Sequence, residues 1–114
     1  MTELAAKRWA KALMELACED EGLSKDDILN DLKEVTESFA VSEELSGMIN
    51  NPSISTEEKQ IVLCKLFQSN LMPVVYNFIY VLNLRKRLNL IADITEEFEH
   101  ELEILESLDL KRCH

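Results

Sequence analysis

Two histidines and three cysteines are the residues of this sequence whose side chains are best suited to metal binding or nucleophilic chemistry. His100 follows Glu97 by three positions and directly precedes Glu101. One histidine with neighbouring carboxylates does not complete a metal site, because protein zinc sites draw on several ligands at once. We therefore interpret His100 as a solvated residue on the acidic face of a helix, and not as a catalytic or metal-binding group.

The cysteines, Cys18, Cys64 and Cys113, are odd in number and far apart, and no Cys-x-x-Cys pair occurs. This spacing indicates neither a zinc ribbon nor a disulfide framework. Cys18 and Cys64 fall within helical patterns, so we predict that they are small core residues of a protein from a reducing compartment. Cys113 and His114, at the end of the chain, could hold a stray metal ion, but a frayed terminus is the simpler interpretation.

The carboxylates are numerous, and most of them follow helical surface positions, which is typical of a solvated face. With only two glycines, the sequence contains no Gly-rich loop of the kind that holds a phosphate. No residues assemble a nucleophile, a base and an orienting group. We predict that the chain is not an enzyme and that it uses no cofactor and no metal.

The formal net charge of −10 and the pI near 4.6 disfavour a general nucleic-acid binder, which needs a surplus of lysine and arginine. The first residues do not predict a signal peptide, because Lys7, Arg8 and Lys11 interrupt their apolar run. The longest apolar stretch, residues 73–84, is too short for a membrane span, which takes about 20 residues. We therefore expect neither nucleic-acid binding nor direct insertion into a membrane.

The composition predicts one all-α domain, because glycine and proline are rare while leucine, glutamate, lysine and alanine are common. Six helices are expected: 3 to about 21, one capped by Ser24, one from Ser42 to the Asn51-Pro52 break, one after the Ser55-x-x-Glu58 capping box, 73–84, and about 90–108. Their expected core faces are Leu4, Trp9, Leu13 and Leu16; Ile28, Leu32, Val35 and Phe39; Leu45, Met48 and Ile49; Ile61, Leu63, Cys64 and Phe67; and Ile91, Ile94, Phe98, Leu102 and Leu105.

The helix expected at 73–84, PVVYNFIYVLNL, is apolar on nearly every side, with Asn77 and Asn83 as its only strongly polar positions. The first helix also carries more apolar surface than a bundle stripe needs, since it adds a band of alanines to Trp9 and Leu13. Two such helices could be central and fully surrounded. Alternatively, they could form a groove that accepts an amphipathic helix from a partner.

Three stretches of the sequence, in this order, resemble the N-terminal domain of the δ subunit of F-type ATP synthase: RWAKALMELACEDE, NNPSISTEEKQIVLCKLF and NFIYVLNLRKRLNLIADITEEFEHEL. The mitochondrial counterpart of that subunit is the oligomycin-sensitivity-conferring protein. The resemblance runs from about Ala5 to Leu105, and one difference is Trp9, where the family usually has tyrosine. It implies a six-helix bundle on top of the catalytic F1 head of the synthase.

The resemblance also implies a function: a groove between helices one and five binds the N-terminal helix of an α subunit. This contact ties the F1 head to the peripheral stalk as part of the stator for proton-driven ATP synthesis. In that groove Trp9 would be a flat anchor, Ala12 the small residue that admits the partner, and Asn77 a hydrogen-bonding group. The full set of expected partner-binding residues is Trp9, Ala12, Leu13, Val74, Asn77, Val81 and Leu84.

By this resemblance, residues 1–108 form the N-terminal helical domain and 109–114 a C-terminal tail. The family's usual second domain, which meets the b subunits of the stalk, is expected to be absent. The chain would lie at the cytoplasmic face of the bacterial inner membrane, as a peripheral part of the complex. The alternative hypothesis is an RNA-binding helical bundle similar to antitermination factors, with small basic clusters at Lys7/Arg8/Lys11 and at 85–87.

Overall fold

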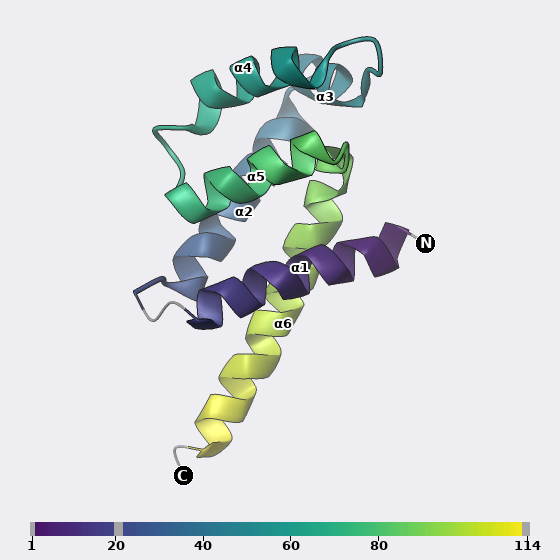
Figure 1. The fold of residues 1–114 in the computed structure, drawn as a ribbon. Helices are drawn as coiled ribbons and strands as arrows, with labels where there is room; N and C mark the ends of the chain where they lie inside the picture. The colour runs from purple at the N-terminus through teal and green to yellow at the C-terminus, as the bar shows by residue number, and fades with distance from the viewer. Residues whose placement is uncertain (1, 20–21, 113–114) are drawn as a thin grey trace.

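The computed structural model describes residues 2–19 and 22–112, with side chains described for 4–19 and 22–107 (Figure 1). These residues form six α-helices and one short 3-10 helix, and none of the residues described is in a strand. The all-α, six-helix prediction is therefore confirmed. The elements are α1 (Thr2–Glu19), α2 (Lys25–Val41), α3 (Glu43–Asn50), α4 (Thr56–Phe67), α5 (Pro73–Leu84), η1 (Leu88–Leu90) and α6 (Ile91–Arg112).

The longest helix, α6, organises the bundle, because α1 and α2 both pack mainly against it (Figure 1). At the other end of the molecule, α3 packs on α2 and α4 packs on α5. The buried apolar residues of all six helices form one continuous core. The last turns of α6 extend away from this core, so the molecule measures 54 × 32 × 23 Å (Figure 1).

Three serines cap helices as the sequence predicts. The Oγ atoms of Ser24, Ser42 and Ser55 each accept a hydrogen bond from the backbone N–H three residues later, at 3.3, 3.2 and 3.1 Å. The Ser55 hydroxyl also lies 3.3 Å from Oε1 of Glu58, so this serine and glutamate pair as in a capping box. Pro73 occupies the first turn of α5, where its missing N–H costs nothing.

The core faces of α2 and α6 agree with the prediction. Ile28, Leu32 and Val35 of α2 are fully buried, and α6 buries its predicted residues from Ile91 to Leu102. The helix α6 continues to Arg112, beyond the end expected at 108, while Cys113 and His114 lie outside the described residues.

The predicted core face of α1 was partly wrong. Leu13 is fully buried, but Leu4 and Leu16 are 55% and 52% exposed. The helix instead buries the small residues Ala6, Ala10 and Ala17, together with Met14. The cause is the close approach of α1 to α6, which small side chains permit and leucines would prevent. Helix α1 ends at Glu19, and the end predicted near Glu21 falls outside the described residues.

The predicted face of α4 needs a similar correction. Leu63 and Phe67 are buried, but Ile61 is 56% exposed and Cys64 is half-buried. Cys18 of α1, predicted in the core, is exposed. Nearly every residue from 61 to 67 is apolar, so the helical period alone does not select the face that α5 covers.

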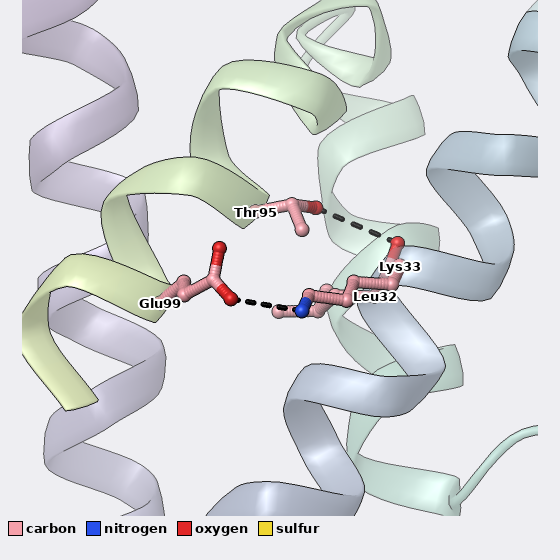
Figure 2. A network of polar contacts seen from close by, with 4 residues as sticks. All are labelled: Leu32, Lys33, Thr95 and Glu99. Carbon is pink, nitrogen blue, oxygen red and sulfur yellow. Dashed lines mark hydrogen bonds and ion pairs between the residues drawn. The ribbon is translucent and has the colours of Figure 1, made fainter. Parts of the chain in front are cut away.

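Polar contacts between α2 and α6 accompany the apolar core (Figure 2). Thr95 is buried, and its Oγ1 lies 2.9 Å from Oγ1 of Thr36 and 3.5 Å from the carbonyl oxygen of Leu32. At the surface, Nζ of Lys33 pairs with Oε2 of Glu99 at 2.8 Å. The two helices that support α1 and α5 are thus fixed against each other by hydrogen bonds as well as by packing.

Candidate protein-binding groove between helices α1 and α5

A groove of about 770 Å³ lies between α1 and α5 and is lined mainly by apolar side chains. Among the described residues that line it, Glu19 is the only charged one. Six of the seven residues predicted to bind a partner line this one groove, and their contact with a partner stays a prediction. The lining consists of Trp9, Ala12, Leu13, Leu16, Glu19, Leu23, Pro73, Val74, Asn77, Phe78 and Val81.

An aromatic pair joins the two helices beneath the groove. The rings of Trp9 and Phe78 meet edge to face, with centroids 6.0 Å apart and an interplanar angle of 72°. Phe78 is buried and Leu13 is fully buried, while Trp9 is half-buried. One part of the indole therefore lies in the core, and the other part is available to a ligand. Tryptophan is common at interfaces for this reason.

Above this floor, the walls combine small and apolar side chains. Ala12 is exposed, and its methyl group leaves room for the backbone or side chain of another helix. On α5, Val81 is 38% exposed and Val74 is half-buried, while the amide of Asn77 is exposed between them. On α5, Phe78 and Leu82 thus face the core, whereas Asn77 and Val81 face outward.

The start of α5 is held in place by α2. The backbone N–H of Met72 donates a 2.8 Å hydrogen bond to Oδ2 of Asp31. Met72 is the N-cap residue of α5 and has no side-chain cap of its own, so the carboxylate satisfies an N–H at this end of the helix. The bond fixes the end of the groove wall that carries Pro73 and Val74.

The seventh predicted residue, Leu84, does not join this groove. It lines a second groove of about 650 Å³ between α4 and α5, with Ile61 and Tyr80 among its neighbours. Leu84, Ile61 and Tyr80 are 51%, 56% and 40% exposed. Asn77 lines both grooves, so α5 forms a ridge between two apolar depressions.

Four apolar residues of the first groove were not among the predicted contacts, namely Leu16, Leu23, Pro73 and Phe78. Leu16 was assigned to the core, and Leu23 follows α1 as a half-buried residue. A signal for Leu16 was present, because Trp9, Ala12 and Leu16 lie at spacings that place them on one helical stripe. Leu23 lies outside any helix, so no period could have found it.

Residues 5–108 match the family described as ATP synthase delta (OSCP) subunit. The chain belongs to the ATP synthase delta (OSCP) family.

Similar proteins include three that are named "ATP synthase subunit delta". The chain is 36% identical to the one from Campylobacter fetus over 101 residues, which are 89% of this chain and 54% of that protein. It is 32% identical to the one from Alkaliphilus metalliredigens over 99 residues, 87% of this chain and 54% of that protein. For Dehalococcoides mccartyi the identity is 38% over 98 residues, with coverages of 85% and 51%.

This delta-family chain spans about half the length of the curated relatives it matches. Both grooves lie entirely within the segment that matches the family. Within the described residues, the family member has no helix that is both long enough and apolar enough to cross a membrane.

A polar network supports α5 on the side away from α1. The buried amide Nδ2 of Asn83 donates to the carbonyl oxygen of Thr56 at 3.1 Å and to Oε1 of Gln60 at 3.3 Å. Nε2 of Gln60 then donates to the hydroxyl of Tyr76 at 2.9 Å. Burial raises the pKa of Tyr76 above its ordinary value, and the neighbouring thiol of Cys64 raises it further. The network thus fixes the α4–α5 pair, while burial favours the neutral form of the phenol.

The described histidine and cysteines of this family member, His100, Cys18 and Cys64, do not form a metal site. His100 is exposed on α6, and Cys18 is exposed on α1. Among the residues that the structure describes, no three His, Cys, Asp or Glu side chains are grouped so that they could hold a metal ion. The described surface instead contains two grooves lined mainly by apolar residues, which are suited to binding another chain.

Proposed function

We propose that this chain is a non-catalytic connector of an F-type ATP synthase, and that its α1–α5 groove binds the N-terminal helix of an α subunit. Membership in the delta (OSCP) family supports the placement in that complex. The observation that carries the specific assignment is the groove itself, which brings Trp9, Ala12, Asn77 and Val81 to one apolar surface.

A partner helix would place one of its faces on this groove. A helix with its side chains is about 10–12 Å across, so it would lie on the groove and insert only one stripe of apolar residues. The exposed part of Trp9 provides a flat anchor of the kind that dominates many interfaces. Ala12 permits close approach, and Asn77 can exchange hydrogen bonds with a polar group at the edge of that stripe.

The role that follows is mechanical. A domain bound to the N-terminal helix of an α subunit is attached to the F1 head, and through the peripheral stalk it prevents the head from turning with the rotor. Rotor torque then drives nucleotide chemistry in the head. Contact with the b subunits of the stalk is not assigned to these residues, and the chain would be peripheral, at the cytoplasmic face of a bacterial membrane.

A fluorescence titration tests this proposal. Trp9 is the only tryptophan, so its emission reports on the groove without labelling. The chain is titrated with a synthetic peptide of the α-subunit N-terminal helix and with a scrambled peptide of the same composition. We expect saturable binding of the first peptide only. The binding should depend little on salt, because the contact is mainly apolar.

Ala12→Asp is the critical variant. It places a carboxylate against apolar surface without a partner, and we expect it to weaken binding by about tenfold or more. Ala92→Asp is the matched control, because Ala92 is exposed on α6 and lines none of the grooves described. Far-UV circular dichroism checks the fold of both variants. Equal affinities of the native chain and Ala12→Asp would exclude the groove as the binding site.

The RNA-binding alternative is tested by a gel shift with short RNA at moderate salt. Both basic clusters are exposed, but the chain carries ten more negative than positive charges, which opposes binding to phosphates. We expect no shift.

A further inference from the structure

A third depression, of about 320 Å³, lies where the α3–α4 connection and the start of α4 meet the segment after α5. It is more polar than the two grooves, because two lysines and three asparagines are among its lining residues. The chain has 22 acidic residues, yet none of those that the structure describes lines this pocket. The polar side chains in its lining include Lys59, Lys86, Asn50, Asn83 and Asn89.

Lys59 is a half-buried cation in this pocket. Its Nζ donates one hydrogen bond, of 2.9 Å, to the backbone carbonyl of Ile49, and an ammonium group has three donors. Among the described side chains, the only ion pair joins Lys33 to Glu99, so the charge of Lys59 is not matched by a carboxylate.

The two acidic residues that precede Lys59 in sequence are not part of the pocket lining, although Glu58 contacts Ser55, which is. Glu57 lines the groove between α4 and α5. Oε1 of Glu58 lies 3.3 Å from the Ser55 hydroxyl, at the N-terminus of the helix. The pocket therefore has an excess of positive charge in a protein that is otherwise strongly negative.

Lys86 approaches the pocket from the other side, and its backbone adopts a conformation that favours glycine. Its φ is 59°, the only positive φ of a non-glycine residue among those described. Its N–H bonds the Asn83 carbonyl at 3.0 Å, and the N–H of Arg87 bonds the Leu82 carbonyl at 2.8 Å, which is the Schellman pattern. The positive φ is therefore that of a helix C′ residue, and it places Lys86 directly after the last turn of α5.

We propose that this pocket is a binding site for a small, multiply charged oxyanion of the phosphate class. The ammonium groups of Lys59 and Lys86 neutralise the anion from two sides, and the amides of Asn50 and Asn89 supply further donors. The neighbouring Arg85 and Arg87 are exposed and add to the local positive potential. The volume lies at the small end of ligand pockets, which favours a compact anion over a nucleotide.

An NMR titration tests the site directly. The ¹⁵N-labelled 114-residue chain is titrated with inorganic phosphate and, separately, with pyrophosphate, at constant ionic strength. We expect saturable shifts of the backbone amides around the pocket, including those of Thr56, Leu88 and Asn89. Sodium chloride added to the same ionic strength should not produce these shifts.

Lys86→Gln and Lys59→Met separate the two charges. Each loses one charge-assisted hydrogen bond, so each should weaken phosphate binding by about tenfold. Lys65→Gln is the control, because Lys65 lies on the same helix as Lys59 and lines the other groove. Lys86 is exposed, so its variant is expected to fold even if the half-buried position 59 does not tolerate methionine.

Three outcomes would overturn the proposal. The first is the absence of saturable shifts for either anion at millimolar concentration. The second is unchanged affinity in Lys86→Gln, verified as folded by its spectrum. The third is an equal loss in Lys65→Gln, which would indicate a general charge effect in place of a site.

Discussion

The indole of Trp9 and the phenyl ring of Phe78 form an edge-to-face contact, with centroids 6.0 Å apart, beneath the groove between α1 and α5. The two helices pack mainly on other elements, α1 on α6 and α5 on α4 and α2. The aromatic pair therefore couples two walls that the rest of the bundle holds separately. A partner in the groove would rest on this pair.

A double-mutant cycle with Trp9→Leu and Phe78→Leu should give a coupling free energy of about 1 kcal/mol, as for other edge-to-face pairs. The free energy of unfolding is measured by urea titration followed by circular dichroism, since Trp9→Leu removes the fluorophore. The control cycle pairs Trp9→Leu with Phe39→Leu, whose ring contacts Phe67 instead. That control should be additive, and additivity in the first cycle would contradict the prediction.

The two asparagines of α5 should differ in how much their substitution changes the stability of the fold. Asn83 is buried and donates two hydrogen bonds to α4, so Asn83→Leu should destabilise the fold by about 1–3 kcal/mol. Asn77 is exposed, so Asn77→Leu should change the free energy of unfolding by less than about 0.5 kcal/mol. Urea titration of both variants measures the difference, and equal effects would contradict the assignment of Asn83 as a structural residue.

The contrast between these asparagines shows what the sequence could predict. Periodicity predicted the buried stripes of α2 and α6, because their apolar residues alternate clearly with charged ones. Three helix starts could also be predicted at a serine, because an N-cap hydrogen bond depends only on residues close in sequence. In α5, by contrast, apolar residues occur on every side, so its period could not show which asparagine was buried. The family resemblance, and not the pattern, directed Asn77 and Val81 to the groove.

The errors have a common physical origin. The α1 sequence offers alanines on one face and leucines on another, and only the close approach of α6 decides that the alanines are buried. Leu84 lies three residues after Val81, a spacing of less than one turn, and this rotation places it on the side of α4. Packing of one helix against another is not encoded in the period of either helix alone.

The stability of the native chain should fall as the pH rises above 10.0, in part through Tyr76. Burial, and then the thiol of Cys64, raises the pKa of this phenol above its ordinary value of 10.0, whereas the hydrogen bond donated by Gln60 lowers it. Below that pH the phenol is neutral in both states. Above it the unfolded chain loses the proton first, so the free energy of unfolding falls as the pH rises. It stops falling once the folded phenol has ionised too.

The measurement compares urea midpoints of the native chain and Tyr76→Phe on both sides of pH 10.0. The two proteins differ only at this residue, so the difference between their pH profiles isolates Tyr76. The native chain should lose more stability than the variant as the pH rises. Parallel pH profiles would show that Tyr76 ionises equally in the folded and unfolded states.

Lys86→Gly should stabilise the fold by about 0.5–1 kcal/mol. A left-handed backbone costs a non-glycine residue roughly 1–2 kcal/mol, and glycine removes that cost while losing part of the gain to the greater freedom of the unfolded chain. Lys11→Gly is the matched control, because Lys11 is exposed inside α1 and should lose about 1 kcal/mol there. The same chemical change therefore has opposite signs at the two positions. Urea titration of both variants measures this, and destabilisation by Lys86→Gly would show that the conformation at φ 59° carries no cost.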